Sequence, residues 1–127
     1  MVQEVCRRHG SQRVVVSVDA KDGLVALQGW TEASTVTVLQ LAHRMGQIGV
    51  VRLLYTNISR DGTLTGPDYQ INAQLVAETG LAVLASGGVA SIEHIKELLP
   101  TGVEGVIVGR ALYTGAVSLP EAVAAVA

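Results

Sequence analysis

The sequence contains no phenylalanine and only one tryptophan, although apolar residues make up 49% of its 127 residues. With so few aromatic rings, valine, leucine, isoleucine and alanine must fill the core. Small apolar side chains of this kind are typical of a parallel sheet that is buried on both faces. The length suits one domain, so we expect a single α/β domain over residues 1–127.

Cysteine and net charge are also scarce. Cys6 is the only cysteine, which excludes an intrachain disulfide and predicts a small buried hydrophobe. The formal net charge is −2, and scattered basic residues argue against a nucleic-acid partner. No signal peptide is recognisable, and no apolar run approaches the roughly 18 residues of a membrane span. We therefore expect a cytoplasmic protein that binds neither nucleic acid nor membrane.

The order of apolar runs predicts alternating strands and helices. Continuous β-branched runs predict four buried strands: Val14–Val18, Val51–Tyr55, Leu81–Ala85 and Gly105–Val108. Apolar spacing and capping residues predict helices over residues 2–9, 34–48, 68–79, 91–99 and 119–126, the second capped by Ser34 or Thr35. A short helical turn follows the last strand. This order indicates βαβ units in a parallel sheet, and the length is half of the about 250 residues of a (βα)8 barrel.

In such folds ligands bind at the carboxyl ends of the strands. Asp19 ends the first predicted strand, where a carboxylate either acts as a general acid or base or simply caps a loop. Thr56 ends the second, where its hydroxyl can bond a substrate oxygen. The long polar loop after Thr56 is of a size usually tied to function, although a plain surface loop is the alternative. Trp30 either covers a ligand or packs in the core.

Glycines follow the last two predicted strands. Gly87 and Gly88 come after the third strand, and Gly109 with Arg110 comes after the fourth. Glycine lets the backbone approach an anion closely, and a helix N-terminus adds a favourable dipole. The loops after the last two strands of these barrels recurrently bind phosphate. Two such loops on consecutive strands therefore predict a phosphate site.

The Asp22-Gly23 dipeptide and the three histidines have simpler interpretations. Asp22-Gly23 is a turn signal. His9, His43 and His94 fall on helical segments, and none has a cysteine or carboxylate at metal-ligand spacing. We expect these histidines to be solvated helix residues, and we expect no metal site.

Together these segments resemble the C-terminal half of the ProFAR isomerase family of histidine biosynthesis, which acts on a phosphoribosylformimino-aminoimidazole carboxamide ribotide. The resemblance covers nearly the whole chain. Its motifs occur in the family's order, and they are Val18-Asp19, Asp22-Gly23, Gln28-Gly29-Trp30, the stretch from Thr56 to Gly66, Ala85-Ser86-Gly87-Gly88-Val89 and the stretch from Gly105 to Tyr113.

The resemblance implies half of a TIM (βα)8 barrel, made of βα units 5–8 preceded by a helix. It implies an Amadori rearrangement of an aminoaldose ribotide to an aminoketose, without cofactor or metal. By this resemblance Asp19 is the general acid, Thr56 assists it, and Trp30 lies on a mobile loop near the substrate. The residues implied to bind substrate or phosphate are Asp61, Gly62, Thr63, Gly87, Gly88, Gly109 and Arg110.

The chain also departs from the family. The first-strand aspartate that acts as general base and the second phosphate site have no counterpart, and Asn57 stands where an acidic residue is expected. The sister cyclase of the pathway shares the loop from Arg60 to Thr63, whereas Gln28-Gly29-Trp30 and the stretch from Val108 to Leu112 favour the isomerase. A dual-substrate isomerase that also acts in tryptophan biosynthesis stays open.

Four parallel strands alone leave two sheet edges and an apolar face exposed, so we expect a homodimer or a higher even oligomer. A twofold dimer would rebuild eight strands and bring Asp19 of each copy to the two catalytic positions, facing a phosphorylated ribotide. We expect weak activity or none. The alternatives are a non-catalytic half-barrel that binds phosphate, and a subunit that requires a separate N-terminal half.

Overall fold

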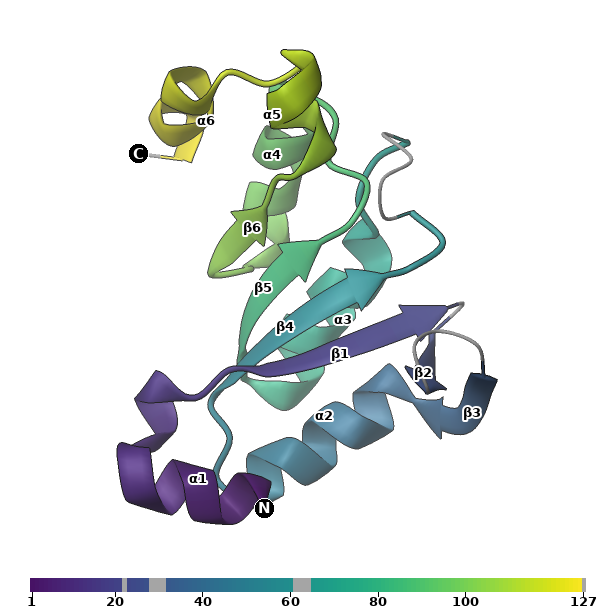
Figure 1. Ribbon diagram of the computed structural model, residues 1–127, viewed down its shortest axis with the longest axis vertical. Helices are drawn as coiled ribbons and strands as arrows, with labels where there is room; N and C mark the ends of the chain where they lie inside the picture. Colours follow the sequence, from purple (N-terminus) through teal and green to yellow (C-terminus); the bar gives the residue numbers. More distant parts are fainter. Residues whose placement is uncertain (22, 28–31, 61–64, 127) are drawn as a thin grey trace.

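A computed structural model describes residues 1–21, 23–27, 32–60 and 65–126 of the chain. In this part the strands form one sheet in the order β3-β2-β1-β4-β5-β6 (Figure 1). The elements are α1 (Val2–His9), β1 (Val16–Lys21), β2 (Leu24–Leu27), β3 (Glu32–Thr37), α2 (Val38–Gln47), β4 (Arg52–Asn57), α3 (Tyr69–Thr79), β5 (Ala82–Ser86), α4 (Ile92–Leu98), β6 (Gly105–Ile107), α5 (Arg110–Thr114) and α6 (Leu119–Val126), with short 3-10 helices at Ser11–Arg13 and Leu99–Thr101.

The four predicted strands pair in parallel, which confirms the α/β fold of a partial (βα)8 barrel. Strand β4 lies between β1 and β5, and β5 pairs with β6. Val18, Tyr55 and Ala85 are partners in register, and all three are buried beneath the helices. Since side chains alternate along a strand, the residues that follow these three point to the opposite face of the sheet.

Residues 24–27 and 32–37 correct the sequence prediction. They form the antiparallel strands β2 and β3, and α2 begins only at Val38 instead of at residue 34. Lys21 pairs with Leu24 in an antiparallel register, and Gly23 between them has a φ of +79°, whereas Asp22 of the predicted turn lies outside the described residues. The first strand also runs to Lys21, three residues beyond the predicted end.

The cap of α2 is likewise different from the prediction. Thr37 caps the helix in place of Ser34 or Thr35, and it does so through a capping box with Gln40. The Thr37 hydroxyl accepts from the Gln40 amide at 3.1 Å, while the Gln40 side chain accepts from the Thr37 amide at 3.0 Å. Helices α3 and α4 begin as predicted, with Asp68 and Ser91 as their caps.

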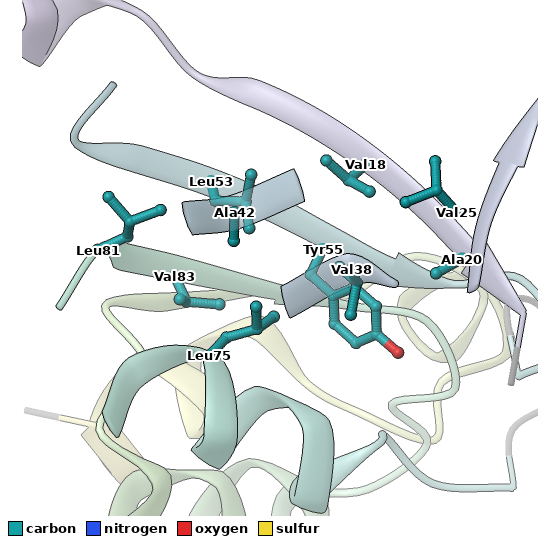
Figure 2. Packing of buried hydrophobic residues seen from close by; sticks show 10 residues of the cluster. All are labelled: Val18, Ala20, Val25, Val38, Ala42, Leu53, Tyr55, Leu75, Leu81 and Val83. Carbon is teal, nitrogen blue, oxygen red and sulfur yellow. The ribbon is translucent and has the colours of Figure 1, made fainter. Parts of the chain in front are cut away.

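The larger core lies between β1, β4 and β5 on one side and α2 and α3 on the other (Figure 2). Its central side chains, Leu53, Tyr55, Leu75 and Val83, are fully buried. Tyr55 supplies the aromatic ring of this cluster, which otherwise consists of small aliphatic side chains. A second cluster joins Ala85 to Ile95 and Leu98 of α4 and extends to Ala111 and Val117.

The amino-terminal edge of the sheet is held by an arginine fork. The Arg52 guanidinium donates to both carboxylate oxygens of Glu104, at 2.5 and 2.9 Å, and to the carbonyl of Gln12 at 2.8 Å. Hydrogen bonding and charge from this pair raise the pKa of Arg52 and lower the pKa of Glu104. The fork lies at the amino-terminal ends of the strands, whereas ligands of such barrels bind at the carboxyl-terminal ends.

Candidate functional site

A row of polar side chains crosses the sheet near the carboxyl ends of its strands. Asp19 of β1 is the register partner of Thr56 in β4, and Thr56 is the partner of Ser86 in β5. Neighbouring strands lie about 4.8 Å apart, so these side chains stand next to one another on the face opposite the helices. Thr56 is only 7% exposed, whereas Asp19 and Ser86 are half-buried.

Ser86 is the member of this row that sequence reasoning did not select. It ends β5 and is the register partner of Thr56 in β4, but in the sequence it stands out only as part of the motif Ala85-Ser86-Gly87-Gly88-Val89. Its hydroxyl extends the row toward the glycine loop that follows. The row therefore offers one carboxylate and two hydroxyls to a bound molecule.

The glycine loops after β5 and β6 are neighbours at the same edge. Ser86 is the register partner of Ile107, so the loop that begins at Gly87 lies beside the loop that begins at Val108. Gly109 precedes α5, and the exposed Arg110 is its first residue. The structure thus brings Gly87, Gly88, Gly109 and Arg110 to the edge that carries Asp19 and Thr56. The other predicted site residues, Trp30, Asp61, Gly62 and Thr63, lie outside the described residues.

Gly88 has a structural requirement of its own. Its φ is +82°, and a Cβ on it would lie 2.3 Å from the carbonyl oxygen of Gly66. The Gly66 amide donates to the Gly88 carbonyl at 2.8 Å, so the end of the loop between β4 and α3 is fastened directly over this glycine. Arg60 strengthens the junction by donating to the Gly66 carbonyl at 3.1 Å.

His94 corrects the prediction of a solvated helix residue. It is half-buried, and its Nδ1 accepts from the Ala90 amide at 3.0 Å. A Cβ on Gly66 would lie 3.3 Å from the His94 Nε2, so the ring fills the space beside the loop junction. His9 and His43 are exposed, as predicted.

The carboxyl end of β4 is anchored by Asp68. One oxygen of its carboxylate, Oδ2, accepts from the Tyr55 hydroxyl at 2.9 Å and from the Asn57 amide group at 3.0 Å. The other, Oδ1, accepts from the Ile71 backbone amide at 3.1 Å and so caps α3. The Asn57 side-chain oxygen in turn accepts from the backbone and hydroxyl of Ser59, at 3.0 and 2.6 Å. A carboxylate, that of Asp68, therefore lies beside Asn57, at the position where an acidic residue is expected.

The environment of this carboxylate changes the ionisation of the tyrosine that bonds it. Burial, followed by the nearby Asp68 charge and the hydrogen bond to it, raises the pKa of Tyr55 well above its usual range. Tyr69, at the start of α3, has its pKa raised to about 12, first by burial and then by Glu97. Both hydroxyls therefore stay protonated at neutral pH, and that of Tyr55 donates to Asp68.

Two general features of the described part bear on the site. Within it, no three histidine, cysteine, aspartate or glutamate side chains gather as a metal ion would require. None of the helices in the described ranges is long and apolar enough to cross a membrane.

Comparison with known proteins identifies relatives along the whole chain. A family model described as histidine biosynthesis protein matches residues 1–118. Relatives from Chloroflexus aggregans, Desulforamulus reducens and Sorangium cellulosum are 48%, 52% and 54% identical over 124, 125 and 114 residues. Each is a 1-(5-phosphoribosyl)-5-((5-phosphoribosylamino)methylideneamino) imidazole-4-carboxamide isomerase, or ProFAR isomerase.

These matches differ in how much of each partner they cover. They take in 98%, 96% and 89% of this chain, but only 51%, 50% and 47% of the three relatives. The chain therefore spans about half the length of the curated relatives it matches.

The loop junction gives a first prediction. Gly88→Ala should lower the free energy of unfolding by about 2–4 kcal/mol, because it combines left-handed strain with a clash against backbone. Gly80→Ala is the matched control: its φ is +69°, but nothing lies within 4 Å of the added Cβ. It should cost only about 1 kcal/mol. Urea unfolding measures both, and equal losses would show that Gly66 does not press on Gly88.

The Tyr55 hydroxyl gives a second prediction. Its pKa is raised on folding, so its contribution to stability is complete below the unfolded tyrosine value of about 10 and declines as the pH rises above it. Between about pH 10 and 11, the free energy of unfolding should fall less steeply with pH for Tyr55→Phe than for the parent. The difference in slope should correspond to about one proton. Thermal unfolding across this range tests it, and identical slopes for the two proteins would contradict the assigned burial.

Proposed function

The chain belongs to the histidine biosynthesis protein family, and we propose that it forms one half of the active site of a ProFAR isomerase in the cytoplasm. The relatives that bear this name are about twice as long as the stretch they share with the chain. The isomerase reaction of this chain is therefore a proposal, and the geometry at the carboxyl edge of the sheet is what supports it.

The observation that carries the proposal is the row of Asp19, Thr56 and Ser86 beside two glycine loops. In an Amadori rearrangement an acid protonates the ring oxygen while the bond from C1 to that oxygen breaks, which leaves a protonated imine. A base then removes the proton from C2, and the resulting enolamine becomes the ketose. Asp19 is placed to be the acid, and Thr56 to orient it or the ring oxygen.

We assign one phosphate of the substrate to the loops after β5 and β6. Gly87 has a φ of +97° and Gly88 one of +82°, a conformation that turns backbone amides in a direction other residues rarely allow. Gly109 has open space where a Cβ would stand, so an anion can come close to its backbone. Arg110 adds a positive charge on the exposed side of the same loop.

The base and the second phosphate site have to come from other βα units. Among the described residues β6 has no strand on its outer edge, and β1 is paired on that side only through Ala20 and Lys21. Next to β6 lies an apolar groove of about 690 Å³ between α4 and α6. Its exposed side chains include Ile107, Leu119, Val123 and Val126, each at least 47% exposed.

We propose that a second copy of the chain fills this groove, with β6 of each copy beside β1 of the other. The four parallel strands of each copy would then close into eight, and Asp19 of the partner copy would stand where a base is needed. Two identical carboxylates in one pocket can act as an acid and a base, because their proximity raises the pKa of one of them. That one stays protonated while the other is ionised. A separate N-terminal half would close the same two edges and is the competing partner.

A non-catalytic role is the second candidate. It is favoured by the single carboxylate of the row, which in one copy leaves no described partner to remove the C2 proton. Such a half-barrel would bind phosphate at the glycine loops without turning substrate over.

Turnover of ProFAR by the purified chain tests the proposal. Asp19→Asn should lower it at least about 100-fold, because the amide cannot donate the proton. Glu104→Gln is the matched control, since it makes the same change at the opposite edge of the sheet and should keep turnover within about twofold.

The outcomes separate the candidates. Equal turnover by the Asp19→Asn variant and the parent would rule out Asp19 as the acid. Turnover that appears only after adding the N-terminal half of the Desulforamulus reducens relative would identify a split enzyme. Binding of inorganic phosphate by calorimetry, with no turnover under either condition, would support the non-catalytic role.

A further inference from the structure

We propose that Asp68 is a positioning residue, whose carboxylate holds Thr56 in place in the row by fixing the strand on both sides of it. The inference rests on the proposed function in treating Thr56 as a residue of the active site. Asp68 itself bonds Tyr55 and Asn57 of β4 and Ile71 of α3, on the helix side of the sheet.

The first step is the arrangement of its hydrogen bonds. Tyr55 and Asn57 flank Thr56 in β4, and both donate to the same oxygen of Asp68, at 2.9 and 3.0 Å. Because side chains alternate along a strand, these two point to the helix side and Thr56 points to the opposite face, where Asp19 and Ser86 also lie. Two bonds to one fixed atom therefore set the position and direction of the peptide units on either side of Thr56.

The second step is the rigidity of the carboxylate. Its other oxygen accepts from the Ile71 amide in the first turn of α3, and the dipole of that helix favours a negative charge there. The Asp68 carbonyl also accepts from the side chain of Asn72, which is buried. Asp68 is thus held by the helix, and it transmits the position of α3 to the end of β4.

The third step is the loop that leaves the site. Asn57 and Asp68 stand at the two ends of the connection between β4 and α3, and the hydrogen bond between them ties those ends together. The end of this connection is fastened over the β5 loop by the bond from Gly66 to Gly88 at 2.8 Å. Loss of the Asp68 bonds should therefore loosen both Thr56 and the Gly66 junction.

A helix cap alone would not need this geometry. Capping requires only an oxygen that accepts from Ile71, and serine does this as well as aspartate. The serine hydroxyl, however, is too short to reach both Tyr55 and Asn57. Asp68→Ser therefore separates the two roles, because it keeps the cap and removes the connection to β4.

The experiment compares four variants of the full chain by nuclear magnetic resonance. The Thr56 backbone amide signal reports the position of the strand, and hydrogen exchange of the Gly66 amide reports the junction. Asp68→Ser should shift the Thr56 signal and speed Gly66 exchange at least about tenfold, since hydrogen bonds to a charged group are lost. Ser91→Ala is the control: it removes the equivalent cap of α4 and should leave the Thr56 signal unchanged.

The third variant tests rescue. In the double variant Asn57→Asp with Asp68→Asn the amide and the carboxylate exchange places, so one can still donate to the other. It should return Gly66 exchange to within about threefold of the parent. Asn57→Asp alone places two carboxylates about 3 Å apart and should speed Gly66 exchange as Asp68→Ser does.

An unchanged Thr56 signal and unchanged Gly66 exchange in Asp68→Ser would overturn the proposal and leave Asp68 a helix cap. Failure of the exchanged pair to rescue would also overturn it. Neither readout requires turnover, so a failure of the isomerase proposal is distinguished from a failure of the positioning role.

Discussion

The parallel register of β1, β4 and β5 is the constraint on which the candidate site depends. Asp19, Thr56 and Ser86 come from segments that are far apart in the sequence, and only their shared register places them in one row. The same register buries Val18, Tyr55 and Ala85 beneath the helices. A slip of one residue in any strand would turn the polar side chain into the core and an apolar one toward the ligand, so packing of the core and assembly of the site enforce one another.

The amino-terminal and carboxyl-terminal ends of the strands are supported in different ways. At the amino edge the fork of Arg52 on Glu104 joins β4 to the start of β6. At the carboxyl edge the connections carry the chemistry and need other means of support. Asp68 anchors the end of β4, and the bond from Gly66 to Gly88 fastens the connection over the β5 loop. Polar junctions between loops thus add to the apolar packing of Val89, Ala111 and Val117 at these ends of the strands.

Much of this fold is predictable from the sequence, for physical reasons that particular residues make plain. Continuous apolar runs predicted the parallel strands. The predicted helix over 68–79 nearly matches α3, because Asp68 caps that helix and Gly80 ends it in a left-handed turn. The hairpin of β2 and β3 was missed because its short strands depend on pairing to the end of β1. Thr37 was missed as the cap of α2 because Ser34 and Thr35 offer the same hydroxyl, and only the end of β3 selects among them.

The site was predictable in part. Asp19, Thr56 and the glycine loops were proposed from their positions after strands, and the structure brings them to one edge. Their roles, and those of Trp30, Asp61, Gly62 and Thr63, remain predictions. Asn57 looked in the sequence like the loss of an acidic residue. Its hydrogen bond to the Asp68 carboxylate spans the whole connection between β4 and α3, and no local pattern reveals it.

In the proposed dimer, the open edge of β6 and the part of β1 that precedes Ala20 are closed by a second copy, which completes the site. The most direct test is the solution mass of the purified chain, measured by light scattering on a sizing column, beside the variant Leu119→Asp with Val123→Asp. We expect a dimer for the parent and a folded monomer for the variant, because the two aspartates place charge in the apolar groove. A well-folded monomer for the parent would contradict the claim, since one copy alone cannot bring a second Asp19 to the row.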